Sequence, residues 1–129
     1  MDELIASVEL QKALFTLLTG DIPVYEIVPA KANFPYFTIK NMSRVNDNTK
    51  TEKRTEHGIY IHTWSKGNSS LESKKMNNFV QNKLATDFKV TGFDVAFVEM
   101  EMEAMQEEQK SEETIFHGTI EFRITLNKK

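Results

Sequence analysis

The three histidines are the first residues to consider for acid–base chemistry or metal binding: His57, His62 and His117. His57 and His62 are five positions apart in a segment that reads as a β-strand, so their side chains are expected on opposite faces and cannot jointly hold a metal there. No His-Glu-x-x-His motif or Ser/His/Asp pattern accompanies them. Each histidine is therefore predicted to be structural or solvent-exposed, and no metal ligand is assigned.

Glutamates are concentrated in residues 99–113, which hold seven of them and one lysine. Such carboxylates can act in pairs as general acid and base, or bind calcium. Their spacing does not follow the loop of an EF-hand, and a run of like charge is typical of a solvated surface. A solvated acidic face is the preferred interpretation. A hydrolase that uses these glutamates is a further alternative, which a metal-dependent activity screen would test.

Other catalytic signatures are missing from the sequence. It contains no cysteine, which excludes disulfides, thiolate metal sites and cysteine nucleophiles. Its five glycines are isolated, so there is no glycine-rich loop to hold a phosphate. The sequence predicts a protein that is not an enzyme and has no cofactor.

The opposite charge is found in residues 40–54, which hold five basic and two acidic residues. Opposite charges in separate parts of a chain suit head-to-tail association, in which a basic surface of one subunit meets an acidic surface of the next. A solvated loop without a partner is the alternative. The candidate interface residues are Arg44, Lys50, Lys53 and Arg54 on the basic side and Glu107, Glu108 and Glu112 on the acidic side.

The length and composition fit one folded domain over residues 1–129, with 40% hydrophobic residues, nine Phe and one Trp. The net charge of −3 gives no basic excess that would favour non-specific binding of DNA. The acidic start Met1-Asp2-Glu3-Leu4 lacks the positive region of a secretory signal, and no apolar run is long enough to span a bilayer. A soluble, unexported chain is therefore expected.

The elements that must position these residues follow from hydrophobic spacing. Apolar residues at helical intervals predict two helices, over about 2–18 and 70–85. Residues 43–56 are polar, carry a turn signal, and are expected to form a mobile loop. Strands are predicted at 24–28, 36–42 and 58–64, and a long hairpin from 93–105 and 114–126. The predicted fold class is α+β, with two helices packed on a mostly antiparallel sheet and a long C-terminal β-hairpin.

The first strand of that hairpin changes character midway. Its odd positions are apolar over 93–97 and become Glu99, Glu101 and Glu103. In a regular strand this places three glutamates on one face, as expected where a strand leaves the core and enters solvent or meets a partner. A helix through the Glu- and Met-rich half is the alternative, because Glu, Met and Ala favour helices.

Tyr60 and Trp64 share one face of the strand at 58–64. They could form the centre of an interface, since aromatic residues are enriched there. Packing in the core against the second helix is the preferred interpretation, because large aromatic side chains are more often buried than used in an interface.

Four segments of the sequence resemble a known family. They are Leu14-Phe15-Thr16-Leu17-Leu18, Asn33-Phe34-Pro35-Tyr36-Phe37-Thr38-Ile39, Ile59-Tyr60-Ile61-His62-Thr63-Trp64-Ser65 with the helix at 69–84, and Gly118-Thr119-Ile120-Glu121-Phe122-Arg123-Ile124. Together they extend over nearly the whole chain, which resembles the tail completion, or tail-to-head joining, proteins of long-tailed phages and prophages. The shared features are a Pro-aromatic strand entry and a strand-Trp-helix unit. They include no catalytic motif, and the acidic segment at 99–113 is not among the segments that carry the resemblance, so its role stays open.

The resemblance implies a non-enzymatic structural subunit that forms a ring at the end of the tail tube and joins the tail to the head connector. It implies a hexamer in the assembled virion, which is compatible with a monomeric isolated chain. A head-completion protein and a tail-tube protein would be its neighbours at the head–tail junction, after assembly in the cytoplasm of the bacterial host. A small-molecule or regulatory binding module is the alternative class of function.

Glu99, Glu101 and Glu103 are candidates to line the channel of such a ring. DNA would pass without specific binding, because acidic side chains repel phosphates and provide no counterion release. The competing explanation is that charged side chains protect an exposed strand against edge-to-edge aggregation.

Overall fold

The computed structural model describes residues 4–110 and 112–129, apart from the side chains of Asn41 and Met42. Its five strands form one sheet in the order β1-β2-β3-β5-β4, antiparallel except for the pairing of β1 with β2. The predicted α+β fold with a C-terminal hairpin is therefore confirmed. The elements are α1 (Ala6–Leu18), β1 (Val24–Tyr25), β2 (Tyr36–Asn46), β3 (Arg54–Gly67), α2 (Leu71–Leu84), β4 (Phe93–Lys110) and β5 (Glu113–Lys128).

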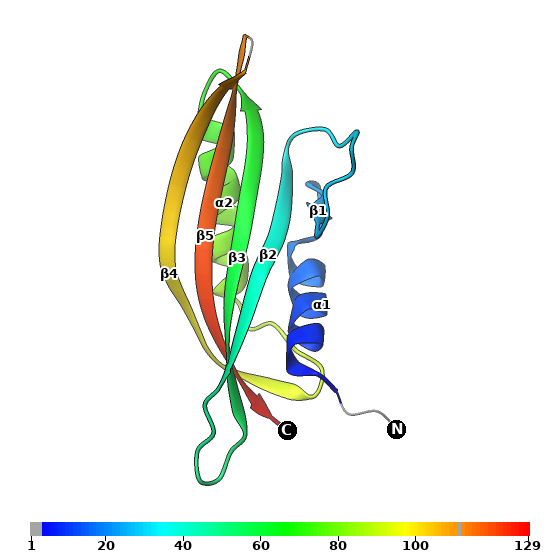
Figure 1. Cartoon of the computed structure of the whole chain (residues 1–129), viewed down its shortest axis with the longest axis vertical. Helices are drawn as coiled ribbons and strands as arrows, with labels where there is room; N and C mark the ends of the chain where they lie inside the picture. Colours follow the sequence, from blue (N-terminus) through cyan, green and yellow to red (C-terminus); the bar gives the residue numbers. More distant parts are fainter. Residues whose placement is uncertain (1–3, 111) are drawn as a thin grey trace.

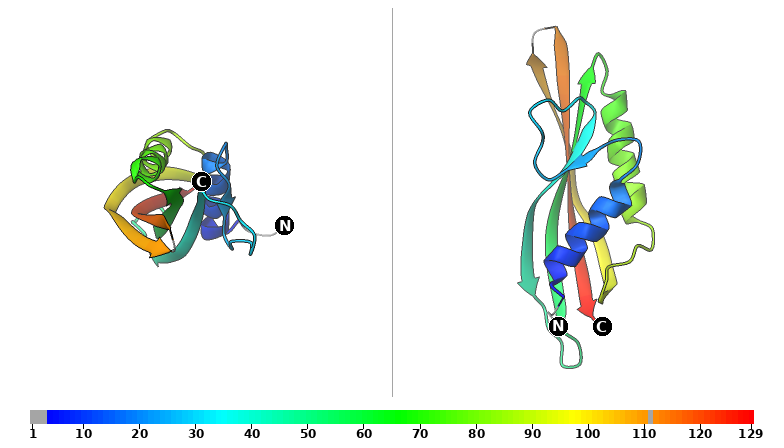
Figure 2. Two further views of the ribbon diagram at one scale, coloured as in Figure 1. Left: turned by 90° about the horizontal axis from the view of Figure 1, so that it is seen from above. Right: turned by 90° about the vertical axis from the view of Figure 1, so that its right-hand side faces the viewer.

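Both helices cover the same face of the sheet (Figure 2). The alternation along β3 shows why: from His57 to Ser65 the odd positions are buried and the even positions are half-buried. The buried side packs aliphatic side chains of the sheet against both helices, and removal of this apolar surface from water is the main stabilisation of the fold. The central members of this core are Leu10, Leu14, Leu18, Ile59, Ile61, Met76, Val80, Leu84, Ile120 and Ile124.

The other face of the sheet has no helix over it in the described part of the chain, and we call it the open face. It carries Thr38, Tyr60, His62, Trp64, His117, Thr119, Glu121 and Arg123, which lie opposite one another across β2, β3 and β5. Strands β2 to β5 are 11 to 18 residues long, so the molecule is elongated. The β2–β3 connection and the tip of the β4–β5 hairpin lie at its two ends (Figure 1).

Half of the polar segment predicted as a loop at 43–56 is strand. β2 continues to Asn46 and β3 begins at Arg54, so only residues 47–53 connect them. Two backbone hydrogen bonds of 2.9 Å close the connection, from the Asp47 amide to the Arg54 carbonyl and from the Thr49 amide to the Glu52 carbonyl. Pairing with a neighbouring strand stabilises these polar residues in extended form, which their own propensity does not predict. The mobility of the connection stays a prediction.

Other bounds also differ from those predicted. α1 begins at Ala6, and residues 2 and 3 of the predicted helix lie outside the described residues. The strand predicted at 24–28 is only two residues long. The alternative of a helix in the Glu- and Met-rich segment is wrong, because each residue over 102–110 pairs with β5. No helix among the described residues is long and apolar enough to cross a membrane.

Candidate functional site

The candidate interface residues lie at opposite ends of the long axis (Figure 1). We call Arg44, Lys50, Lys53 and Arg54, at the β2–β3 end, the basic end. We call Glu107, Glu108 and Glu112, at the end of the β4–β5 hairpin, the acidic tip. The fold does not bring the two sets together within one subunit, so any contact between them joins two copies of the chain.

The side chains of the four residues of the basic end differ in the contacts that they form. Arg44 donates a hydrogen bond of 3.2 Å to the Asn46 side chain. The guanidinium of Arg54 lies 5.4 Å from the centre of the Phe97 ring, a cation–π contact on the open face. The exposed Lys50 and Lys53 side chains form no ion pair with the described residues. These two lysines are therefore the free cations of this end.

The acidic tip is exposed and only partly neutralised. Lys110 lies 3.9 Å from a carboxylate oxygen of Glu108, and Lys66 lies 2.6 Å from one of Glu113. Glu107 and Glu112 have no ion pair with any residue that the structure describes. A cationic partner would therefore find two uncompensated carboxylates here.

The three channel candidates do not share a face. β4 contains two β-bulges, at residues 96 and 101, and each inserts one residue and reverses the alternation. Glu99 lies opposite Arg123 on the open face, whereas Glu103 lies opposite Ile120 on the helix face. The prediction that Glu99, Glu101 and Glu103 line one face is therefore wrong. The first bulge also explains why apolar residues on the helix face are at odd positions up to Val95 and at even positions from Val98 to Met100.

Glu103 connects the edge strand to α2. Its carboxylate accepts hydrogen bonds from the side-chain amides of Asn77 (3.0 Å) and Gln81 (3.1 Å). Asn77 in turn accepts a hydrogen bond of 2.6 Å from the Thr63 hydroxyl. By contrast, the Glu101 carboxylate lies 3.5 Å from the Arg123 guanidinium, in an exposed ion pair. Glu103 therefore has a structural position, and Glu99 and Glu101 stay available to solvent.

Aromatic rings form a row across the open face. The rings of Trp64 and His117 stack with centres 3.8 Å apart and planes 9° apart, and Tyr36 stacks on Trp64 at 6.2 Å. The Trp64 indole donates a hydrogen bond of 3.2 Å to the Thr38 hydroxyl. The prediction that Trp64 packs against the second helix is wrong, because Trp64 occupies an even position of β3 and both helices cover the odd positions.

His62 and His117 form a pair in this row. His62 Nδ1 lies 2.8 Å from His117 Nε2, so one ring donates a hydrogen bond and the other accepts it. Burial lowers the pKa of His62, and the nearby His117 and Lys40 lower it further. Burial also lowers the pKa of His117. Both shifts favour the neutral form of the rings.

His57 lies on the helix face, fully buried, and is thus on the face opposite His62 as predicted. Its Nε2 lies 2.8 Å from the Thr55 hydroxyl. Burial, aided by the positive charge of Arg44, lowers the pKa of His57 to about 4. This ring is a neutral member of the core and has no surface exposed to solvent.

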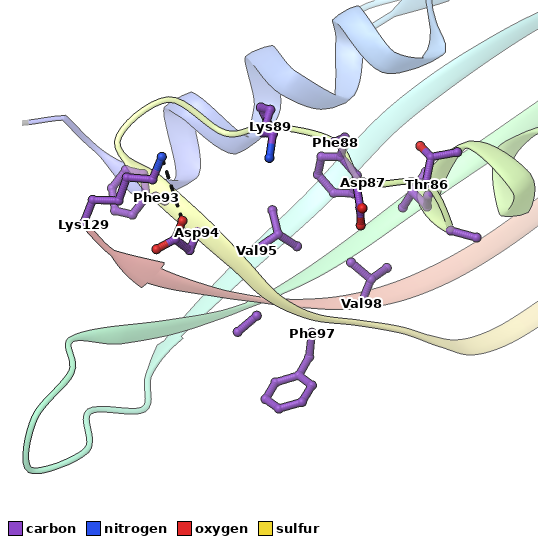
Figure 3. Close-up of a pocket in the computed structure, with 13 residues that line it drawn as sticks. Thr86, Asp87, Phe88, Lys89, Phe93, Asp94, Val95, Phe97, Val98 and Lys129 are labelled. Carbon is purple, nitrogen blue, oxygen red and sulfur yellow. Dashed lines mark ion pairs between the residues drawn. The ribbon is translucent and has the colours of Figure 1, made fainter.

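The structure also contains a pocket of about 360 Å³ between the connection at 85–92 and the start of β4 (Figure 3). The side chains of Val95 and Val98 point into it, while Phe97 points away. Asp94 and Lys129 on its rim lie 3.8 Å apart and pair with each other. Among the described residues no group of three or more His, Cys, Asp or Glu side chains is arranged to hold a metal.

A match to a known protein family shows what kind of protein this is. The family model of tail completion protein gp17 matches residues 3–127. The chain belongs to this family. The resemblance identified in the sequence is thereby confirmed, and the tail completion protein is a phage-like structural tail protein.

A solved structure supports the fold of this tail completion protein. A chain of the virion of a native gene transfer agent particle superposes with a TM-score of 0.80, at 13% sequence identity, over 97% of this chain and 99% of that one. At this identity the similarity shows the fold alone. No curated protein sequence matches the chain.

Sequence reasoning missed two features of this tail completion protein. It did not pair His62 with His117, although both alternate with apolar residues in strands, because the pairing of β3 with β5 cannot be read from either strand alone. It also missed the contact of Glu103 with α2. Met100 and Met102, on either side of the second bulge, lie on opposite faces of the sheet. Both are at even positions of the sequence, so the sequence alone does not indicate this change.

Proposed function

We propose that this tail completion protein forms a hexameric ring at the end of a tail tube and joins the tail to the head connector. In this ring the basic end of one subunit contacts the acidic tip of the next. The observation that carries the proposal is the separation of Lys50 and Lys53 from Glu107 and Glu112 at opposite ends of the molecule (Figure 1). Complementary charges of this kind give orientation to an interface and steer its formation.

The ring would lie at the head–tail junction of the virion, between a head-completion protein and a tail-tube protein, after assembly in the bacterial cytoplasm. Family membership supports a role in completing the tail. The similar chain in a gene transfer agent virion supports a virion component. DNA would pass through the ring without specific binding.

Charge exchange tests the contact between subunits. The variant Lys50→Glu/Lys53→Glu makes both ends acidic, and Glu107→Lys/Glu112→Lys makes both ends basic. Each variant alone should fail to assemble, because its two ends repel each other. A mixture of the two should assemble again, since every contact in an alternating ring then joins opposite charges. Such a ring needs an even number of subunits, which six satisfies. Mass by light scattering and ring counts by electron microscopy measure the result.

The variant Lys74→Glu/Lys75→Glu is the matched control, because it makes the same charge change on two exposed lysines of α2 that belong to neither charged set. It should assemble like the natural chain. Arg54 and Arg44 are left unchanged because they contact Phe97 and Asn46. Normal assembly of either charge-exchanged variant on its own would show that the two ends do not meet.

For the channel, we propose that the part of the open face around Glu99 and Glu101 lines the path of the DNA. Glu103 is no longer a candidate, because it is bonded to α2. In assembled tails, Glu99→Lys/Glu101→Lys should slow DNA ejection, since each lysine adds a phosphate contact. Glu99→Gln/Glu101→Gln, which removes negative charge without adding positive charge, is the control. Ejection at the normal rate from intact lysine-variant tails would contradict the proposal.

A further inference from the structure

Three polar atoms on the open face lie close enough together to act as ligands. His62 Nδ1 and His117 Nε2 are 2.8 Å apart, and the Thr119 hydroxyl oxygen is 3.3 Å from the first and 3.5 Å from the second. Strand pairing fixes this arrangement: His62 is directly opposite Thr119, and His117 is the next residue of β5 on the same face. The cluster is thus held by two central strands of the sheet.

We propose that His62 Nδ1, His117 Nε2 and Thr119 Oγ1 bind one divalent transition-metal ion of the class that prefers imidazole, such as Zn²⁺, Cu²⁺ or Ni²⁺, with water in the remaining positions. Ligands about 2.0–2.2 Å from an ion lie roughly 3.3–3.6 Å apart at the tetrahedral angle that Zn²⁺ prefers, and roughly 2.8–3.1 Å apart at the 90° angle of Cu²⁺ and Ni²⁺ sites. The two separations from Thr119 Oγ1 fit the tetrahedral spacing, whereas the 2.8 Å between the two ring nitrogens fits a 90° angle and widens to the tetrahedral spacing only if one ring turns. The site is independent of the ring proposed above.

The protonation state of the two rings favours binding. A histidine must be neutral to donate its lone pair to a metal. Burial lowers the pKa of both His62 and His117, which favours the neutral form of each ring. Imidazole ligands select Zn²⁺, Cu²⁺ and Ni²⁺ over Mg²⁺ and Ca²⁺, which prefer oxygen.

Binding requires one ring to change its tautomer. In the hydrogen-bonded pair one of the two facing nitrogens carries a proton, and that proton moves through solvent to the other nitrogen of the same ring. Both lone pairs then form bonds to the ion, and both rings stay neutral. His117 is held by its stack on Trp64, whereas the His62 ring lies 6.3 Å from Trp64 and is tilted by 38°. His62 is therefore the ring that turns toward the ion.

The charges around the cluster set the affinity. Lys40 lies close enough to His62 to lower the pKa of that ring, and it repels a cation for the same reason. Glu121 is the next residue of β5 on this face, opposite Tyr60. Replacement of Lys40 by a neutral residue should therefore tighten metal binding, although Lys40 is not a ligand.

Trp64 provides a direct measurement, because it is the single tryptophan of the chain and stacks on one ligand. Titration of the full chain with Cu²⁺ should quench its fluorescence, and titration with Zn²⁺ followed by calorimetry measures binding without relying on Trp64. The variant His62→Asn leaves the Trp64–His117 stack intact and should weaken Zn²⁺ binding at least about tenfold, as loss of a metal-site partner commonly does. Thr119→Val should weaken it less, and Thr119→Ser should restore it.

The variant Lys40→Gln keeps all three ligands and should bind Zn²⁺ more tightly than the natural chain. Binding should weaken in every protein as the pH falls through the pKa values of the rings, because protons then occupy the lone pairs. Zn²⁺ affinity that is unchanged in both His62→Asn and Lys40→Gln would overturn the proposal and place any binding elsewhere on the chain. A circular dichroism spectrum of each variant checks the fold.

Discussion

At the scale of single residues, Gly118 lies close to Asn77 of α2 and to Thr63 of β3. A Cβ atom there would approach the Thr63 hydroxyl and the Asn77 side-chain amide to less than 3.0 Å. Gly118→Ala should therefore lower the free energy of unfolding by about 1–3 kcal/mol, the usual cost of overpacking. Gly20→Ala is the control, since nothing lies within 4 Å of its Cβ position. Denaturant unfolding of both variants measures the difference, and equal stability would contradict the close approach.

His57 should make stability depend on pH. Its pKa is lowered to about 4 in the fold, whereas in the unfolded chain it is near 6.5. As the pH falls from about 7 to about 4, the unfolded state gains a proton that the folded state excludes, and stability should drop by up to about 3 kcal/mol. His57→Gln should flatten this part of the profile. His62 and His117 contribute in the same direction in both proteins, so the difference between the two profiles reports His57.

At the scale of elements, the edge strand β4 is connected to α2 by one glutamate on its helix face. Glu103 accepts two hydrogen bonds from α2, while Glu99 faces the open side in an exposed position. Glu103→Ala should destabilise the fold by about 1 kcal/mol or somewhat more, because it also leaves Asn77 without this partner. Glu99→Ala should change stability by less than about 0.5 kcal/mol. Thermal unfolding of the two variants tests the bulge at residue 101, since a regular strand would make them equivalent.

At the scale of the whole molecule, the elongated shape and the two charged ends predict which backbone amides become protected from exchange on assembly. In the isolated subunit, the amides of residues 47–53 should exchange faster than the centres of β3 and β5, because the connection is exposed. Ring formation should slow this exchange. High salt screens exposed charges and should restore it as the ring dissociates. Protection in the isolated chain equal to that of the strands would contradict the prediction, as would a ring insensitive to salt.

Much of the fold could be predicted from local patterns. The helix over residues 71–84 and the alternation along β5 are visible because each buries one face of a single element. The basic and the acidic segment could also be predicted, because the net charge of a segment can be counted from its sequence without knowledge of contacts. The extension of β2 and β3 into polar residues could not be predicted, since its stabilisation comes from pairing partners far along the chain.

The sequence by itself determined the α+β class, the tail completion family and the presence of a basic and an acidic segment, because composition, periodicity and short motifs are properties of neighbouring residues. Only the tertiary structure decided that Glu103 lies on the helix face, that Trp64 lies on the open face, and that His62 meets His117 across two strands. These outcomes depend on strand register and on two bulges. A shift of one residue in register moves a side chain to the other face of a sheet, and the free energy that selects the register comes from contacts between distant segments.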